Sequence, residues 1–582
     1  MTQPALHYRV AMPAPASHLF EVTLTVRDWQ APTLDLKMPV WTPGSYLVRE
    51  YARHLQDFAA QVGDRPLTAR KLAKNHWQIA TDGATELTVF YRLYANELTV
   101  RTNHLDATHG YFNGAATFFY VPGYEDCPIE VAIAPPHPEW QVATPLDPVS
   151  ETAAGRQVFR AKDFDELVDS PFEVGIHELH EFEARGKTHQ YAIWGRGNAN
   201  VARIVADTRK IIEVEADLFG ELPYERYLFI LHLSAGGYGG LEHKDSCSLN
   251  YPRLGFQAKD RYQRFLQLVA HEFFHLWNVK RLRPAELKTF DYDSENYTEL
   301  LWFFEGATSY YDLLIPLRAG IYDAETFLDN VAKDISRLQS TPGRLVQPLA
   351  ESSFDAWIKL YRRDEYSNNN QISYYLKGQF VSLLLDLLIR DRTQNARSLD
   401  DVMRQLWQTY GRNEAGVSSE QLAAVLAEVA GTDVRDFLAQ VLTTTAELPF
   451  AEYLAPFGLE LIPHLPEDMP PHLGLKLADE AGKTTVKFSQ ATGPAGTVGI
   501  EAGDQLLAID GLRVTAANLD DRLRDYRSGD RLELALFHQD ELVLRTVTLT
   551  APEPQGYRLT AVADPTAIQQ ERYHGWLGVP LV

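Results

Sequence analysis

The pattern of apolar and polar side chains changes twice along this chain of 582 residues, which divides it into three regions. Up to about residue 165, short runs alternate apolar and polar positions, as in residues 19–26 and 86–91, and turn residues separate them. Alternation with a period of two places the apolar side chains on one face of a β-strand. We therefore predict an all-β domain, a sandwich or an open sheet, over residues 1–165.

The second region, residues 166–460, is mostly helical after one buried strand predicted at residues 227–233. Residues 265–277 and 300–311 are apolar on nearly every side, which indicates buried helices. Residues 368–370 are expected to form a loop. Apolar positions at helical spacing predict three further helices, in residues 379–389, 399–407 and 419–429.

The third region, residues 466–560, returns to short strand-like runs separated by glycine-containing turns. Turns at Gly503 and Gly511 bracket a central predicted strand, so this region is expected to form a compact β-rich module. The last segment, residues 561–582, carries apolar aromatic side chains, among them Trp576, and we expect it to dock back on the protein.

Within the buried helix of residues 265–277, the sequence His-Glu-Phe-Phe-His suggests a metal site. His271 and His275 are four residues apart and therefore lie on one face of the helix, where both can reach one zinc ion. Glu272 lies between them in the position of a general base. Buried polar groups of this kind are costly without partners, and a metal ion removes that cost. The alternative is that these are core histidines satisfied by ordinary hydrogen bonds.

A hydrolytic zinc site needs a third protein ligand and one open position. Glu305 is the carboxylate in the middle of the apolar segment 300–311, and a metal ion would be a favourable partner for it. The alternative is a salt bridge with a nearby arginine or a turn cap. Glu299 and Asp312 flank the segment nearer its polar ends, and we interpret both as solvated charges.

Several short sequences together resemble one family of peptidases. The His-Glu-x-x-His pair followed by Glu305-Gly306 resembles the gluzincin metallopeptidases, whose third ligand is that Glu. Residues 239–243, Gly-Gly-Leu-Glu-His, resemble the Gly-x-Met-Glu-Asn sequence of gluzincin aminopeptidases, and residues 375–378 resemble their Tyr-x-Lys-Gly. Residues 41–46 and 275–284 are similar to the PDZ-containing glycyl aminopeptidase family, over most of the chain.

The resemblance implies a multidomain protein. It adds to the N-terminal all-β domain a thermolysin-like α+β, mostly helical gluzincin catalytic domain over residues 166–460 and a bacterial-type PDZ domain over residues 466–560. In such a domain, the loop at residues 473–475 would present backbone N–H groups to a peptide C-terminus.

The resemblance also implies an activity, a zinc-dependent aminopeptidase that removes a small N-terminal residue, Gly or Ala, from peptides with a free N-terminus. One Zn²⁺ per chain would be held by three ligands, His271, His275 and Glu305. Glu272 would be the general base and Tyr375 would stabilise the oxyanion. Glu242, with Gly239 and Gly240, would bind the substrate ammonium group.

The sequence departs from the family pattern at several positions. The 29 residues between His275 and Glu305 are more than in the best-known gluzincin aminopeptidases, and the polar part, residues 284–298, is expected to loop out. Leu241 and His243 replace Met and Asn. The histidine-orienting Asp of thermolysin-like enzymes, four residues after the third ligand, is Ser309 here, so that partner must come from elsewhere.

Composition limits the partners. With 78 acidic and 55 basic residues, the net charge of −23 argues against nucleic acid and anionic membranes. The two cysteines, Cys127 and Cys247, cannot form a disulfide framework, and Cys247 is expected to be a small buried residue. No secretory signal and no apolar stretch of about 18 residues is evident, so we expect a cytoplasmic protein.

Two other functions remain open from the sequence. An endopeptidase using the same zinc chemistry would also cleave blocked peptides, and Glu242 argues against it. A non-catalytic PDZ adaptor would need no general base, yet the base, three candidate ligands and Tyr375 are all present.

Overall fold

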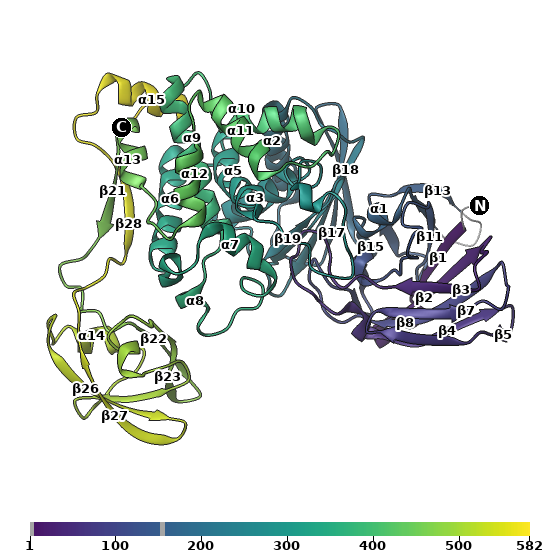
Figure 1. Ribbon diagram of the computed structural model, residues 1–582, viewed down its shortest axis with the longest axis horizontal. Helices are drawn as coiled ribbons and strands as arrows, with labels where there is room; N and C mark the ends of the chain where they lie inside the picture. Colours follow the sequence, from purple (N-terminus) through teal and green to yellow (C-terminus); the bar gives the residue numbers. More distant parts are fainter. Residues whose placement is uncertain (1–4, 152–156, 582) are drawn as a thin grey trace. The chain divides into compact units, whose positions relative to one another are not determined.

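The computed structural model describes residues 5–151 and 157–581 and contains two compact units (Figure 1). The first predicted domain therefore begins, and the last ends, outside the described residues. The first unit comprises Met1–Thr298, Tyr311–Tyr322 and Asp400–Val425, and the second comprises Glu299–Tyr310, Asp323–Leu399 and Leu426–Val582.

The N-terminal part of the first unit is built from β-strands, as predicted. Its largest sheet has the order β13 (Asp147–Glu151), β14 (Gln157–Ala161), β11 (Ile129–Ala134), β1 (Ala5–Ala11), β2 (Leu19–Arg27), β8 (Leu87–Tyr94), β4 (Leu55–Val62) and β5 (Arg65–Pro66). A second sheet is β3 (Thr33–Lys37), β7 (His76–Ala80) and β6 (Ala69–Ala73), and a third is β12 (Gln141–Ala143), β15 (Phe172–Gly175), β10 (His109–Phe112) and β9 (His104–Leu105). The short helix α1 (Phe164–Val168) follows β14.

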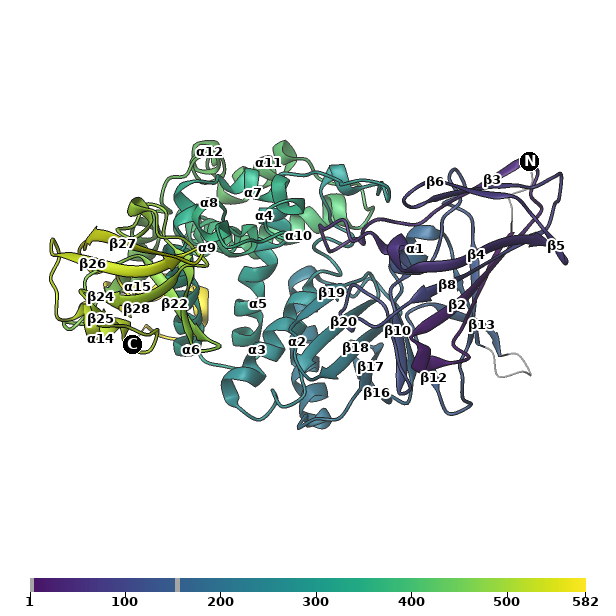
Figure 2. The same ribbon diagram turned by 90° about the horizontal axis from the view of Figure 1, so that it is seen from below.

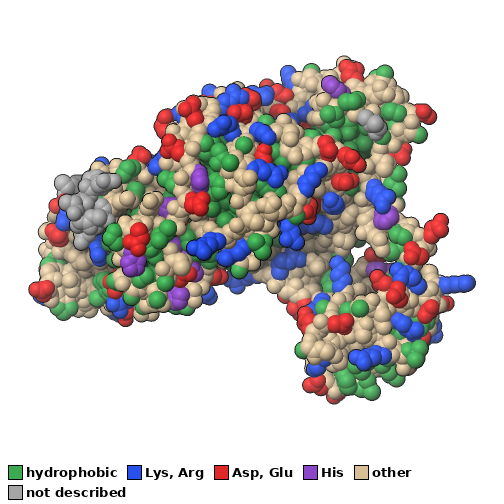
Figure 3. All heavy atoms as spheres, turned by 180° about the vertical axis from the view of Figure 1, so that it is seen from behind, with side chains coloured by type: hydrophobic (Ala, Val, Ile, Leu, Met, Phe, Trp, Pro, Cys, Tyr) green, Lys and Arg blue, Asp and Glu red, His purple; other side chains and the backbone are tan. Residues whose placement is uncertain are grey.

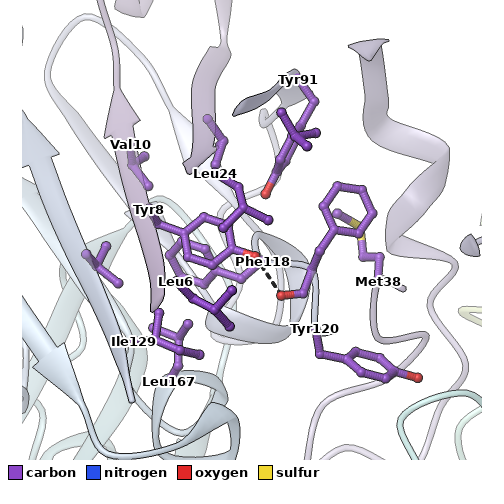
Figure 4. Packing of buried hydrophobic residues seen from close by; sticks show 14 of the residues in the cluster. Leu6, Tyr8, Val10, Leu24, Met38, Tyr91, Phe118, Tyr120, Ile129 and Leu167 are labelled. Carbon is purple, nitrogen blue, oxygen red and sulfur yellow. Dashed lines mark hydrogen bonds between the residues drawn. The ribbon is translucent and has the colours of Figure 1, made fainter. Parts of the chain in front are cut away.

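The core of this β-domain forms because alternate strand residues point inward. In β2, every second side chain from Phe20 to Val26 is fully buried. Tyr8 lies among these apolar side chains and donates a hydrogen bond to the carbonyl oxygen of Phe119 at 2.7 Å (Figure 4). The period-two pattern thus encodes this domain.

A mixed five-stranded sheet follows in the same unit. Its order is β16 (Glu178–Ala184), β17 (Lys187–Trp194), β18 (Arg226–Ser234), β20 (Ser246–Pro252) and β19 (Gly239–Glu242). The strand predicted at residues 227–233 is confirmed as β18. The glycine segment forms β19, an edge strand of this sheet, against which α3 (Lys259–Phe274) packs; α2 (Val201–Phe219) packs against α3.

The expectation that residues 284–298 loop out is wrong. This segment has little regular structure, but it packs against the β-domain, where Tyr292 belongs to the hydrophobic core. Trp41 donates its indole N–H to the carbonyl of Asp291 at 2.8 Å, and Asp293 pairs with Lys37. The Tyr292 ring, the Asp291 carbonyl and the Asp293 carboxylate anchor a segment whose polar composition indicated a solvated loop.

Helices make up most of the second unit. They are α4 (Leu301–Phe304), the start of α5 (Gly306–Arg318), α6 (Ala324–Gln339), α7 (Leu349–Phe354), α8 (Ser367–Asn370), α9 (Tyr374–Thr393), α12 (Arg435–Thr443) and α13 (Phe450–Leu454). Of the other predicted helices, α10 (Leu399–Leu406) and α11 (Ser419–Ala430) occur where expected. Two predictions were wrong in detail, because the helix expected over residues 300–311 is interrupted at Glu305 and residues 368–370 are helical rather than a loop.

One helical stretch is long and apolar enough, by length and composition alone, to cross a membrane. Within the described residues this is Ser367–Thr393, and 78% of its apolar window is buried inside the protein. We expected no apolar stretch of this length from the sequence, so that expectation was wrong for this segment. Its burial is that of a core helix.

A strand ribbon, β21 (Leu459–His464) and β28 (Gly556–Ala561), brackets a β-rich module in the second unit (Figure 1), and several strands of this module are labelled in Figure 2. The module has β22 (Leu475–Glu480), β23 (Lys483–Ser489), β24 (Gln505–Ile509), β26 (Arg531–His538) and β27 (Glu541–Thr548) in that order, with β25 (Leu512–Arg513) beside β24 and a helix, α14 (Leu519–Leu523). It has its own hydrophobic core. After β28, α15 (Ala567–Leu577) contacts the helices, where Trp576 donates to the Tyr310 hydroxyl at 3.0 Å.

Charges of both signs lie on the face of the protein shown in Figure 3, although the net charge is −23. In Figure 3, acidic and basic side chains are interspersed over the face shown. Many of them are paired, as in the ion pair between Arg92 and Glu21 at 2.8 Å.

Candidate metal centre and peptidase site

Helix α3 ends at the first candidate ligands. Its sequence places His271 and His275 one turn apart, and their Nε2 atoms are 3.1 Å from each other. His275 is the C-cap residue of α3, where the backbone leaves the helix. Both side chains are thus held on one face, as the four-residue spacing predicted.

The second nitrogen of each ring has its own partner. His271 Nδ1 lies 2.9 Å from Asp312 Oδ2, and His275 Nδ1 donates to the carbonyl of Asn278 at 2.7 Å. Since both partners are acceptors, each neutral ring carries its proton on Nδ1 and its lone pair on Nε2. The interpretation of Asp312 as a solvated charge was wrong, because the carboxylate is half-buried against His271.

Glu305 completes a three-ligand cluster. It is buried at the break between α4 and α5, and one carboxylate oxygen lies within 4.8 Å of ligand atoms from both histidines. The glycines beside it permit close helix packing, because a Cβ on Gly378 would lie 2.2 Å from the carbonyl oxygen of Trp302 and one on Gly306 would lie 2.4 Å from the Gly378 carbonyl carbon. This contact explains the Glu-Gly and Lys-Gly pairs of the two sequence patterns.

The donor set fits a divalent cation. Two Nε2 lone pairs that face each other at 3.1 Å repel unless a positive charge lies near both. Two imidazoles and one carboxylate are ligands that zinc accepts. Carboxylate and carbonyl partners on the Nδ1 atoms are the arrangement by which proteins orient metal-binding histidines.

Glu272 is buried beside this cluster and close to strand β19. A Cβ on Gly240 would lie 2.1 Å from the Glu272 carboxyl carbon, so only glycine permits this approach. Burial raises the pKa of Glu272 to about 7, opposed by His271 and supported by the neighbouring Glu242 carboxylate. Arg101 lowers the same pKa and donates to the Gly240 carbonyl at 3.0 Å, which fixes the strand.

Glu242 occupies the end of β19 and is 4% exposed. Its Oε1 has no hydrogen-bond partner among the described residues, and its carboxylate, the Glu272 carboxylate and His275 offer atoms within 4.8 Å of one another. An unpaired buried carboxylate is a site for a cation. The adjacent His243, which replaces the family's Asn, is bound instead to Asp169 at 3.2 Å.

Tyr375 is the second residue of α9 and is half-buried, whereas Tyr374 is fully buried. The Tyr375 hydroxyl lies 3.1 Å from that of Tyr361. Burial and then the Glu305 charge hold the Tyr375 pKa well above its usual value, so the hydroxyl stays a proton donor. Lys377 in the same sequence is buried, and burial lowers its pKa.

Three residues at the site were not predicted from the sequence. Asp312 is seven residues after Glu305, and in one uninterrupted helix this spacing of about two turns would place both on one face, a signal that was available in the sequence. Arg101 and Gly44 come from the β-domain, and no local pattern connects them to β19. Gly44 lies in a segment that the family resemblance had already singled out.

Family models match two parts of the chain. The Peptidase M61 N-terminal domain matches residues 7–176, and the M61 glycyl aminopeptidase model matches residues 264–381, which include all three candidate ligands. A search of curated proteins gave no match.

One solved structure extends the similarity to nearly the whole chain. The crystal structure of an aminopeptidase N family protein from Idiomarina loihiensis has a TM-score of 0.92 and 33% identity, over 98% of this chain and 100% of that one. An M1 zinc metallopeptidase from Deinococcus radiodurans has a TM-score of 0.50 and 15% identity, over 77% of this chain and 95% of that one, and shares the fold. The chain is a peptidase and belongs to the M61 glycyl aminopeptidase family.

Proposed function

We propose that this protein is a zinc-dependent aminopeptidase that removes an N-terminal glycine or alanine from peptides. The observation that carries the proposal is the cluster of His271, His275 and Glu305, with ligand atoms within 4.8 Å of one another. Glu242 and Glu272 beside it supply the two further charges that an aminopeptidase needs. One Zn²⁺ per chain would polarise the scissile carbonyl and lower the pKa of water.

The chain's own residues account for the proton transfers. Glu272 accepts a proton from the attacking water and delivers it to the leaving amine, for which a pKa near neutrality suits both directions. Tyr375 donates a hydrogen bond to the oxyanion, which requires the protonated hydroxyl that its raised pKa maintains.

Glu242 sets where the peptide is cut. Its unpaired Oε1 accepts the ammonium group of the first residue, so the next peptide bond is the one presented to Glu272. This favours the aminopeptidase over the endopeptidase, because a blocked N-terminus carries no charge to pair with a buried carboxylate. The glycyl aminopeptidase family supports the choice of small first residues.

We also propose that residues 466–560 form a PDZ domain. Its sheet leaves β22 at one edge, next to a loop in which Gly474 has φ +82°. An edge strand and a glycine-containing loop suit a peptide C-terminus, whose carboxylate would accept backbone N–H bonds and whose backbone would extend the sheet.

The test compares glycyl, alanyl and leucyl anilides with N-acetylglycyl anilide, before and after chelation and return of zinc. We expect hydrolysis of the free glycyl and alanyl substrates, lost on chelation and restored by zinc. Cleavage of the acetylated control would favour the endopeptidase. Absence of all cleavage, with one zinc bound per chain, would remove the support for a peptidase acting on these substrates.

A further inference from the structure

A loop of the β-domain touches the carboxylate of Glu242. Gly44 has φ +87°, a backbone conformation that side chains disfavour. A Cβ built on it would lie 2.4 Å from Glu242 Oε1 and 2.7 Å from Oε2. Contact at this distance means that the Gly44 backbone itself forms the surface next to the carboxylate.

The Gly44 loop is held rigidly in place. Trp41 is bonded to the Asp291 carbonyl, Thr42 donates to the Asn113 side chain at 3.3 Å, and the Ser45 hydroxyl accepts from Arg49 at 2.9 Å. These bonds tie the loop to its surroundings on several sides. The surface that it presents to Glu242 is therefore fixed rather than adaptable.

Strained backbone occurs at Val279, which lines the same cavity as Glu242. Val279 has φ 128°, which is exceptional for a β-branched residue. It follows Asn278, whose carbonyl accepts the His275 bond, so the strain occurs where the chain leaves the candidate metal ligands. Backbone strain of this kind persists where surrounding structure enforces it, and it concentrates at functional sites.

Gly44, Val279 and Glu242 line one small cavity, which we name the Glu242 cavity. Its other walls include Trp41, Tyr46 and Leu287. Its volume is about 10 Å³, roughly the space that one water molecule requires. A hydrogen atom or a methyl group fits such a space, and a branched side chain does not.

We infer that the Glu242 cavity receives the side chain of the substrate's first residue, and that Gly44 and Val279 limit it to glycine or alanine. The inference rests on the proposed function, in which Glu242 binds the ammonium group. The α-carbon is about 1.5 Å from that nitrogen, so the side chain must begin beside the same carboxylate. Gly44 and Val279 are the fixed surfaces that it meets there.

Two substitutions change the cavity in opposite directions. Val279→Gly removes the side chain and its strain and enlarges the cavity, while Gly44→Ala fills the space next to Glu242. Gly186→Ala is the matched control, because Gly186 also has a positive φ, +71°, with no atom within 4 Å of an added Cβ. Zinc content and melting temperature of each variant establish that it is folded and loaded.

The readout is kcat/KM for glycyl, alanyl and leucyl anilides. We expect Val279→Gly to raise the leucyl-to-glycyl ratio at least about 10-fold, the discrimination that a few methylene groups provide in a pocket. Gly44→Ala is expected to raise KM for glycyl anilide at least about 10-fold with kcat less changed, and Gly186→Ala to match the unmodified protein. Leu287→Ala widens another wall and replaces Val279→Gly if that variant does not fold.

An unchanged leucyl-to-glycyl ratio in a folded, active Val279→Gly protein would overturn the inference, as would wild-type hydrolysis of leucyl anilide at the glycyl rate. Failure of the proposed function is separable from this, because binding of glycinol and leucinol can be measured by calorimetry without turnover. Tighter binding of glycinol than leucinol, equalised in Val279→Gly, supports the cavity's role, and equal binding to the wild type refutes it.

Discussion

Removing the Asp312 carboxylate should weaken metal binding without removing a ligand. Asp312 Oδ2 lies 2.9 Å from His271 Nδ1, and both side chains are less than 20% exposed. The carboxylate fixes the ring's tautomer and orientation and raises the basicity of Nε2. Asp312→Ala leaves His271 free to rotate and leaves its Nδ1 proton without a charged acceptor.

The expected magnitude follows from the loss of this one bond. Partners of metal-binding histidines are worth about 10- to 100-fold in metal affinity. A factor of 10 corresponds to about 1.4 kcal/mol, so the binding free energy should weaken by about 1.4–2.8 kcal/mol. Asp312→Asn keeps an acceptor but loses the charge, so its effect should lie between that of Asp312→Ala and none.

The assay is competition for zinc between the protein and a chelator of known affinity. Asp35→Ala is the matched control, because Asp35 makes a similar bond to His76, 2.7 Å long, in the β-domain. Zinc affinity should be unchanged in this control and abolished in a His271→Ala protein. Equal zinc affinity in Asp312→Ala and the unmodified protein would refute the orienting role.

Four further predictions concern Glu272 and two contacts in the second unit. Glu272→Gln should lower kcat by about 10²–10⁴-fold while one zinc per chain remains bound, as measured by single-turnover kinetics and metal analysis; full activity would exclude the base. Because the folded pKa of Glu272 is raised to about 7, its contribution to stability is present at low pH and lost as pH rises from its ordinary value of 4.5 towards 7. Between pH 4.5 and 7.5, the free energy of unfolding of the metal-free protein, measured in urea, should therefore fall by on the order of 3 kcal/mol more than that of metal-free Glu272→Gln. Parallel curves of unfolding free energy against pH for the two proteins would contradict this. Gly378→Ala should lower stability by about 1–3 kcal/mol, because its Cβ would lie 2.2 Å from the Trp302 carbonyl, and an unchanged melting temperature would show that the helices can separate there. Asn369→Ala removes bonds of 2.9 Å to the Ser489 carbonyl and 3.0 Å from the Ala491 N–H, so hydrogen exchange at the end of β23 should quicken, whereas an unchanged rate would mean that these bonds do not hold the module.

The local parts of the site were predictable because their geometry is set by short spacings. Four residues on a helix bring His271 and His275 to one face whatever surrounds them. The period-two pattern predicted the β-domain for the same reason, since alternate strand residues point to opposite faces. Glu305 was identifiable as the single carboxylate in the middle of an apolar segment, although the helix break at that residue was not.

The polar segment of residues 284–298 shows where composition misleads. Its charged side chains predicted a solvated loop, yet the Asp293 carboxylate pairs with Lys37 and the Asp291 carbonyl accepts a hydrogen bond from Trp41, both some 250 positions earlier in the sequence. Whether a carboxylate is solvated or paired depends on which distant segment lies against it. The same reason explains the misassignment of Asp312, whose partner is on another helix.

The sequence by itself determined the helix face that His271 and His275 share, the place of Glu272 between them and the β-rich N-terminal domain, since each follows from residues within one or two turns or strands. Only the tertiary structure decided what surrounds them. The contact of Gly44 with Glu242, that of Gly240 with Glu272, and the bond of Arg101 to β19 join segments far apart in the chain. Such contacts depend on how whole sheets and helices pack, which no local pattern of apolar and polar residues encodes.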